Sequence, residues 1–270
     1  MTIEGVDFSW ARPGGAALVA SGKRFVVRYL TGDGKALTAA EAADYHGHGL
    51  TIALVFETTK GRALGGQAAG TVDGQSARNA AAALGIPTAV PIYFAVDFDA
   101  SADQQPAIDA YLKGAASVLG RDRIGVYGGL RVVTRCHDNA TARWFWQTYA
   151  WSGGKIAPFI HLYQYHNGQT INHGAVDFCR AYRANFGQWP QPADDQSQPA
   201  AAAHHYKVVI SGGPVRLYSR IQGNVLGAVT LATYECTRSK HGGIWWYSIV
   251  AGKRSGQAFQ PNHFTMARYV

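Results

Sequence analysis

Three copies of the tripeptide Val-Asp-Phe are the feature of this sequence that most directly suggests chemistry. Each copy stands where a short apolar run predicts the end of a β-strand, and the copies span Val6–Phe8, Val96–Phe98 and Val176–Phe178. Side chains alternate along a strand, so each aspartate points away from its Val and Phe neighbours. The sequence therefore predicts that the three aspartates share one face, with the bulky residues packed on the other.

Two further acids extend this set. Glu57 closes the apolar run Thr51–Glu57, and Asp99 follows Asp97 by two residues, which predicts the same face. Small residues, namely Gly5, Ala95 and Ala175, are expected behind the acids on that face. Buried together, like charges raise one another's pKa, as a general acid requires. The simpler alternative is that each aspartate caps the turn after its strand. The predicted catalytic set is Asp7, Glu57, Asp97, Asp99 and Asp177.

Aromatic and amide side chains fall near the same predicted strand ends. They would offer stacking faces and hydrogen bonds to a sugar, and the predicted substrate-binding residues are Tyr93, Tyr127, Trp146 and Gln164. The alternative is that the aromatic side chains belong to the core.

Several inward carboxyl groups suit cleavage of a glycosidic bond, which uses one protonated and one ionised carboxyl group. A competing possibility is an acid cluster that holds Mg²⁺ or Ca²⁺ for phosphodiester hydrolysis. His46 and His48 have no third ligand partner in the pattern, so no metal site and no cofactor are predicted. No G-x-S-x-G motif is present, which gives serine nucleophile catalysis no support.

The elements that must position these residues alternate between β-rich runs and Ala-rich helical runs. This alternation predicts an α/β fold, a compact (β/α)8 barrel with some crossovers reduced to loops. A doubly wound open sheet is the alternative, but no G-x-G-x-x-G follows the first run. The predicted strands are Ile3–Phe8, Arg24–Leu30, Thr51–Glu57, Val90–Asp97, Arg123–Tyr127, Arg143–Thr148, Phe159–Gln164 and Ala175–Phe178. The predicted helices are Pro13–Ser21, Thr38–Gly47, Gln75–Leu84, Ala102–Leu119 and Leu130–Asn139, with Thr38 and Glu41 spaced as a capping box.

Composition predicts two domains of different charge. With 270 residues, 47% hydrophobic and 16% charged, the chain is of globular type. Residues 1–203 carry 17 basic and 16 acidic residues, a net +1, whereas residues 204–270 carry 8 basic residues and one acid, a net +7. A Pro/Gln/Ala-rich segment separates them. The predicted boundaries are a barrel at 1–188, a linker at 189–204 and a small all-β domain at 205–270.

The sequence also bears on localisation and redox state. No apolar stretch reaches the roughly 18 residues of a membrane span, and the first residues lack the pattern of a signal peptide. We therefore expect synthesis in the cytoplasm without a signal peptide. Three widely spaced cysteines, Cys136, Cys179 and Cys236, predict reduced structural thiols.

The ordered motifs of the first domain resemble a known family. The motifs are GVDFSW, FET, IYFAVDFD, GVYGG, LYQY and AVDF, and over residues 1–186 they resemble the glycoside-hydrolase-like barrels first catalogued as domain of unknown function 1906, which are similar to family 25 lysozymes. The resemblance implies a (β/α)8 barrel acting on peptidoglycan glycan. The lysozyme pattern has D-x-E after the fourth strand, where this chain has Asp97-Phe98-Asp99, so Glu57 becomes an alternative proton donor.

The basic tail resembles bacterial SH3-like wall-binding domains, with Trp245 and Trp246 as the predicted wall-binding residues. Its charge suits anionic wall polymers and makes nucleic acid a weaker alternative. Together the two resemblances imply a peptidoglycan hydrolase of N-acetylmuramidase type, with the layout of a bacteriophage endolysin and antimicrobial action at the wall. The competing class is a glycan-binding protein whose barrel has lost catalysis.

Overall fold

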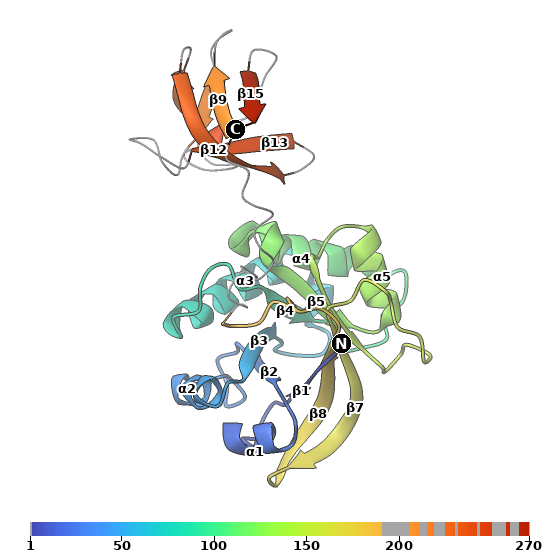
Figure 1. The fold of residues 1–270 in the computed structure, drawn as a ribbon. Helices are drawn as coiled ribbons and strands as arrows, with labels where there is room; N and C mark the ends of the chain where they lie inside the picture. The colour runs from blue at the N-terminus through green and yellow to red at the C-terminus, as the bar shows by residue number, and fades with distance from the viewer. Residues whose placement is uncertain are drawn as a thin grey trace. The chain divides into compact units, whose positions relative to one another are not determined.

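The computed structural model describes residues 2–190 in full, and the backbone of seven strands between residues 206 and 269 (Figure 1). The chain divides into two compact units, Met1–Asp194 and Asp195–Val270. Among the described residues, no helix is both long enough and apolar enough to cross a membrane.

The first unit is a closed barrel of eight strands in sequential order (Figure 1). This confirms the predicted α/β barrel. The strands are β1 (Ile3–Asp7), β2 (Phe25–Tyr29), β3 (Thr51–Phe56), β4 (Ile92–Ala95), β5 (Ile124–Gly128), β6 (Trp144–Thr148), β7 (Leu162–Ile171) and β8 (Gly174–Ala181). Strands β1 to β7 pair in parallel, whereas β8 is antiparallel to both β7 and β1.

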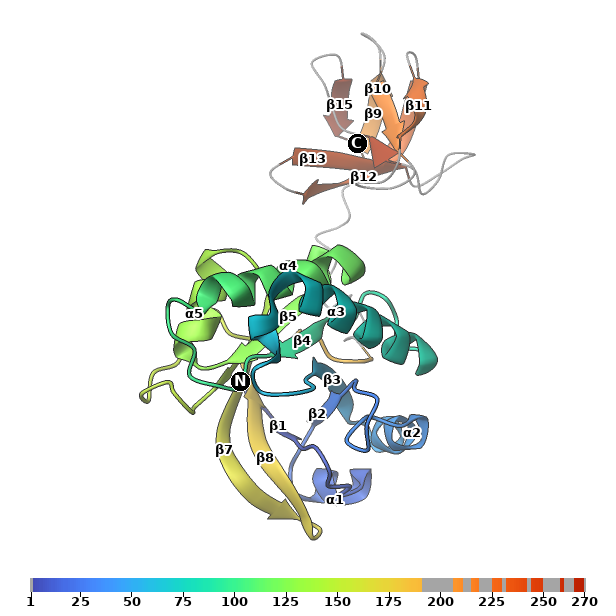
Figure 2. The same cartoon turned by 180° about the vertical axis from the view of Figure 1, so that it is seen from behind.

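The antiparallel β8 corrects the prediction that every strand runs the same way. A two-residue turn, Asn172-His173, joins β7 to β8, and both residues have positive φ, 46° and 63°. Such turns suit the twist of a hairpin, and asparagine tolerates this conformation. The hairpin extends past the other strands of the barrel in both views (Figures 1 and 2). Because β8 runs backwards, Asp177 lies in the middle of its strand and not at its end.

Five helices accompany the barrel: α1 (Gly15–Ala20), α2 (Ala39–Gly47), α3 (Gly66–Ala83), α4 (Gln105–Leu119) and α5 (Leu130–Asp138), with short 3₁₀ turns η1 (Arg62–Gly65) and η2 (Arg121–Arg123). The capping box at α2 forms as predicted, because the Thr38 side chain accepts from Glu41 N and the Glu41 carboxylate accepts from Thr38 N. Helix α3 begins nine residues before the predicted start at Gln75.

Two apolar layers hold the first unit together. Val6, Phe8, Leu54 and Phe56 belong to the layer between the strands and the helices. The second layer fills the barrel interior and consists mainly of Phe25, Val27, Ala53, Val55, Tyr93, Ala95, Tyr127, Trp146, Leu162, Cys179, Ala181 and Phe186. The alternation predicted for the first and third strands is therefore observed.

Helices α3 and α4 lie side by side (Figure 2), and glycine makes this close approach possible. A Cβ on Gly70 would lie 1.8 Å from the carbonyl oxygen of Tyr111, and one on Gly114 would lie 2.2 Å from that of Gln67. Buried Asp73 fixes the same contact, accepting from Tyr111 Oη at 2.8 Å and from Arg62 Nη2 at 2.7 Å.

The barrel includes Trp189, which lies one residue inside the range predicted for the linker. Trp189 and Ile52 of β3 exchange backbone hydrogen bonds of 2.7 Å, and the Trp189 ring packs edge-on against His46. Residues 191–204 of the predicted linker lie outside the described residues.

The described part of the second unit is a seven-stranded sheet in the order β11-β10-β14-β13-β12-β9-β15. The strands are β9 (Tyr206–Ile210), β10 (Val215–Tyr218), β11 (Val225–Val229), β12 (Ala232–His241), β13 (Ile244–Ile249), β14 (Ala258–Phe259) and β15 (Thr265–Tyr269). Trp245 and Trp246 lie on β13, opposite Lys240 and Ser239 of β12, and their side chains lie outside the described residues. The SH3-like assignment stays a prediction.

Candidate active site

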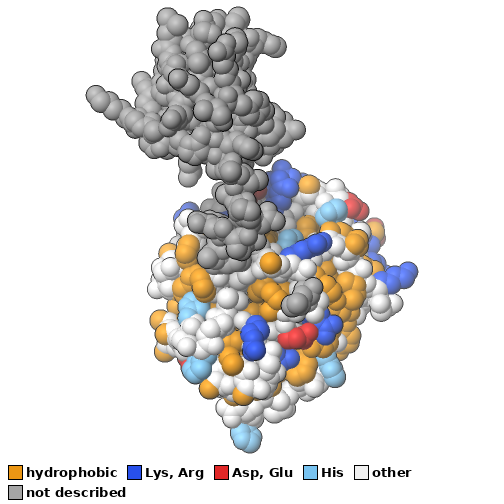
Figure 3. Space-filling view, viewed as in Figure 1, with side chains coloured by type: hydrophobic (Ala, Val, Ile, Leu, Met, Phe, Trp, Pro, Cys, Tyr) orange, Lys and Arg blue, Asp and Glu red, His pale blue; other side chains and the backbone are white. Residues whose placement is uncertain are grey.

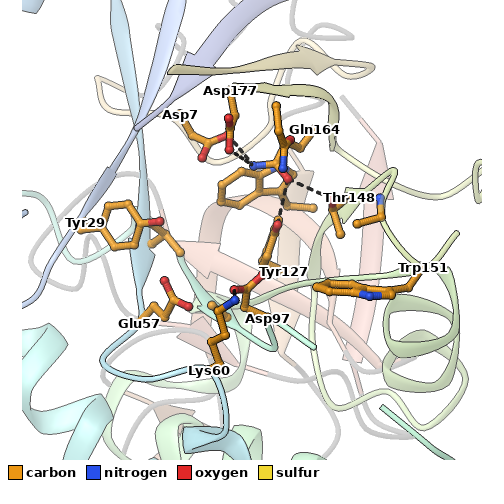
Figure 4. Close-up of a pocket in the computed structure, with 15 residues that line it drawn as sticks. Asp7, Tyr29, Glu57, Lys60, Asp97, Tyr127, Thr148, Trp151, Gln164 and Asp177 are labelled. Atoms are coloured by element: carbon orange, nitrogen blue, oxygen red, sulfur yellow. Dashed lines mark hydrogen bonds and ion pairs between the residues drawn. The ribbon is translucent and has the colours of Figure 1, made fainter. Parts of the chain in front are cut away.

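A pocket of about 310 Å³ opens where the predicted acids converge, and every strand of the barrel contributes to it directly or through the residues that follow it (Figure 4). Its size is at the lower end of the range for small-molecule sites. The lining residues are Asp7, Tyr29, Val55, Glu57, Lys60, Ala95, Asp97, Tyr127, Trp146, Thr148, Ala150, Trp151, Gln164, Asn167 and Asp177. Four of the five predicted catalytic acids are among them.

Asp7 is the most deeply buried of these acids, with 4% of its surface exposed. Burial and then the neighbouring Asp177 raise its pKa to about 7, because both disfavour the charged form. Cys179 Sγ donates to Asp7 Oδ2 at 3.0 Å. The thiol can do so because burial raises its pKa and keeps it protonated. Cys179 of β8 faces the barrel interior next to the acids. Ala175 was predicted to take this inward position, but it is exposed. Because β8 runs antiparallel to the other strands, the inward residue next to Asp177 is Cys179 and not Ala175.

Gln164 joins Asp7 to Asp177 across the β1–β8 pair. Its Oε1 accepts from Tyr127 Oη at 2.8 Å and from Thr148 Oγ1 at 2.9 Å. These two donors fix the amide so that Nε2 donates to Asp7 Oδ2 at 2.8 Å and to Asp177 Oδ2 at 3.4 Å. Burial raises the pKa of Asp177, although the Gly168 N–H, 2.8 Å from Oδ1, opposes the shift. The two carboxyl groups thus take hydrogen bonds from neutral donors.

The opposite wall pairs its acids with lysines, of which Figure 4 shows Lys60 beside Asp97. Lys60 Nζ lies 3.7 Å from Asp97 Oδ2, and Lys35 Nζ lies 3.6 Å from Glu57 Oε2. Burial raises the pKa of both carboxyl groups, and the lysines oppose that shift by stabilising the charged forms. The Asp7–Asp177 pair therefore has only neutral hydrogen-bond donors, whereas each acid of the opposite wall has a lysine that stabilises its charged form.

Buried Arg28 positions the loop that carries Lys35, the partner of Glu57. Its guanidinium group pairs with Glu41 of α2 at 2.8 Å and donates to the carbonyl oxygens of Phe8 and Lys35. The loops after β1 and β2 are therefore tied to one charged group. Lys35 also lies 4.5 Å over the Tyr29 ring, which helps to direct its ammonium group toward Glu57.

Asp99 does not join the pocket, which corrects its predicted place beside Asp97. Strand β4 ends at Ala95, so the alternation of a strand no longer applies to residues 97–99, and the chain bends where Ala100 N bonds Phe98 O. Asp99 is exposed and pairs with Arg131 of α5. Its side chain is absent from the pocket lining.

Tyr93 is also outside the pocket. It faces inward on β4, but two residues below Ala95, and is fully buried, donating from its hydroxyl to Phe186 O at 2.7 Å. The alternative core assignment therefore holds for Tyr93. Of the other predicted substrate-binding residues, Tyr127, Trp146 and Gln164 all line the pocket, and Trp146 is only 2% exposed.

Sequence reasoning missed Tyr29, Lys60, Thr148, Trp151 and Asn167 of the pocket lining. The same alternation that identified Asp7 could have found Tyr29, since Phe25 and Val27 of β2 face inward. Lys60 and Trp151 lie in loops, where no periodic signal exists. Among the described residues, no three His, Cys, Asp or Glu side chains are grouped closely enough to hold a metal ion.

An eight-stranded barrel whose pocket gathers carboxyl groups and aromatic side chains is the arrangement of a glycoside-hydrolase-like protein. Residues 16–185 match the Rv2525c-like, glycoside hydrolase-like domain family, and the chain belongs to that family.

Sequence and structure comparisons agree on one relative from Mycobacterium tuberculosis. The protein named "Putative peptidoglycan hydrolase Rv2525c" is 31% identical over 185 residues, which cover 66% of this chain and 71% of that protein. A crystal structure of the Tat-secreted Rv2525c with L-tartrate superposes with a TM-score of 0.67 at 29% identity, covering 69% of this chain and 98% of that one.

Comparison with solved structures also gives more distant matches, the first of which shares the fold. An uncharacterised B. stearothermophilus protein superposes with a TM-score of 0.52 at 21% identity, covering 67% of this chain and 96% of that one. A bacterial lysozyme from Streptomyces coelicolor gives 0.45 at 12% identity, covering 67% of this chain and 92% of that one.

Proposed function

We propose that this protein is a peptidoglycan hydrolase that cleaves glycosidic bonds of the glycan strand by carboxyl catalysis, as an N-acetylmuramidase. The observation that carries the proposal is the division of one pocket into two unlike walls. Asp7 and Asp177 share neutral donors, whereas Asp97 and Glu57 are paired with lysines. The relationship to Rv2525c supports peptidoglycan as the substrate.

The two walls suggest a division of labour. Glycosidic cleavage needs a protonated carboxyl group for the leaving oxygen and an ionised one for the developing positive charge at the sugar. The Asp7–Asp177 pair supplies the proton, because burial and the neighbouring Asp177 raise the pKa of Asp7 to about 7. Asp97, whose charged form Lys60 stabilises against the effect of burial, is assigned to the oxocarbenium-like centre. Gln164 holds the donor pair in place, and Glu57 with Lys35 completes the charge of the second wall.

The second unit is proposed to be an SH3-like module that binds the wall through its basic charge and through Trp245 and Trp246. This two-part layout favours an endolysin-like enzyme that acts at the bacterial wall.

The test is to incubate the purified full-length protein with peptidoglycan and measure new reducing ends. We expect the wild type to release reducing ends, and we expect Asp97→Asn to lower the rate of release at least a hundredfold. The matched control is Asp99→Asn, which should keep a rate near that of the wild type because Asp99 lies outside the pocket. Wall binding with no released sugar would instead support the glycan-binding alternative. EDTA-sensitive cleavage of a phosphodiester substrate, without new reducing ends from peptidoglycan, would support the metal-dependent phosphodiesterase.

A further inference from the structure

Trp151 differs from the other aromatic side chains of the pocket because it remains open to solvent. It lines the pocket, yet 40% of its surface is exposed, whereas Trp146 of the same pocket is 2% exposed. Figure 4 shows its indole ring at the edge of the pocket, away from the wall formed by Asp7 and Asp177. An aromatic face left open beside a polar pocket is a surface on which a ligand ring can pack.

The backbone at Trp151 is in a conformation that bulky residues rarely adopt. Its φ is 57°, in the left-handed region that favours glycine. Gly153 and Gly154 follow in the same turn with φ of 56° and 73°. Glycine therefore occupies the two neighbouring left-handed positions, whereas position 151 carries a tryptophan. Backbone strain of this kind persists only where the surroundings impose it, and it is concentrated at functional sites.

The surroundings of Trp151 are built to impose that conformation. The adjacent Ser152 is 3% exposed, donates from Oγ to Thr148 O at 2.6 Å, and accepts from Leu130 N at 3.0 Å and Gln147 Nε2 at 3.1 Å. The backbone of Gly129 packs closely on Trp151, since a Cβ there would lie 3.1 Å from Trp151 Cβ. The turn is thus anchored to β6 and to the start of α5, which presents the ring as a rigid surface.

We propose that Trp151 is a stacking platform for one pyranose ring of a glycan chain, forming a sugar subsite at the edge of the pocket. The flat faces of a pyranose carry C–H groups that pack on an aromatic ring, and the rigid turn means that little ordering is needed on binding. This inference rests on the proposed function for the class of ligand, but it concerns binding and does not require hydrolysis.

The experiment measures binding apart from catalysis. Full-length protein carrying Asp97→Asn is titrated by calorimetry with a peptidoglycan tetrasaccharide and, separately, with chitotetraose. Adding Trp151→Asn should weaken binding about tenfold, because it removes one aromatic contact with the sugar. Adding Trp151→Phe should retain most of the affinity, because an aromatic ring remains. Asparagine tolerates the left-handed backbone, so the thermal midpoint of unfolding should stay near that of the parent.

The matched control is Ile156→Asn, in the same connection between β6 and β7. Ile156 is 45% exposed but does not line the pocket, so its variant should bind as the parent does. The inference is overturned if the Trp151→Asn variant binds within twofold of the affinity of the parent. It is also overturned if Ile156→Asn loses as much affinity as Trp151→Asn, or if the parent binds neither glycan. If the wild type binds through Trp151 but releases no reducing ends, the hydrolase proposal fails and the platform stands.

Discussion

Asp7 shows how a single residue in this barrel acquires its properties from its position. The end of β1 places its carboxyl group inside the barrel, where burial and Asp177 raise the pKa from 3.8 to about 7. Hydrogen bonds from Cys179 and Gln164 limit the shift but do not remove it. A group with this pKa keeps its proton through weakly acidic pH and is about half protonated near pH 7, so it can act as a proton donor.

The raised pKa of Asp7 predicts a pH-dependent stability. Between about pH 4 and pH 7 the folded state keeps a proton that the unfolded state has released, so this residue lowers the free energy of unfolding as the pH rises through that window. The effect reaches about 4 kcal/mol at its upper limit. Asp7→Asn should therefore be more stable than the wild type at pH 8, with the difference shrinking toward pH 4.

Urea unfolding at pH 4, 6 and 8 would measure this dependence. An Asp7→Asn variant whose stability differs from that of the wild type by the same amount at each pH would contradict the account.

At the scale of elements, the alternation of inward and outward side chains along each strand predicted much of the barrel from the sequence. Asp7 is the clearest success, because it terminates a regular strand whose neighbours alternate. The prediction was wrong for Asp99 and Ala175, where the assumption of a continuing parallel strand failed at the bend after β4 and at the reversed β8. Single-sequence periodicity says which face a residue takes, but not the direction of a strand. The positions of loop residues such as Trp151 depend on tertiary contacts that no local pattern encodes.

The contact between α3 and α4 yields a prediction about stability. Gly70→Ala places a Cβ 1.8 Å from Tyr111 O, so the helices must separate, and we expect a loss of about 3 kcal/mol. Gly47→Ala is the matched control, because Gly47 also lies in a helix but its Cβ would meet nothing within 4 Å. That substitution should stabilise the protein by roughly 0.5 kcal/mol.

Thermal unfolding of the two variants in parallel tests this packing. Equal midpoints for Gly70→Ala and Gly47→Ala would show that the helices are not held in close contact.

At the scale of the whole molecule, charge separates the two units. The net +1 of residues 1–203 contrasts with the net +7 of residues 204–270. On the face of the first unit seen in Figure 3, acidic side chains are few and basic ones are dispersed among apolar ones. A division of roles between a nearly neutral barrel and a basic module would separate catalysis from attraction to an anionic wall.

This division predicts which charges matter for binding to the wall. In the full-length protein, Lys253→Gln with Arg254→Gln should weaken sedimentation with purified walls several-fold and reduce its salt dependence. Arg78→Gln with Lys113→Gln is the matched control, because it removes two exposed charges from the first unit. Equal weakening by the two pairs would contradict a wall-binding role for the basic unit.

The central claim, that the carboxyl groups of this barrel pocket cleave glycan, is tested most directly by mass spectrometry of peptidoglycan digested with the full-length protein. The account predicts fragments whose new reducing ends are N-acetylmuramic acid, and their disappearance with Asp97→Asn. Intact glycan strands after digestion, or the same fragments from the Asp97→Asn variant, would contradict it.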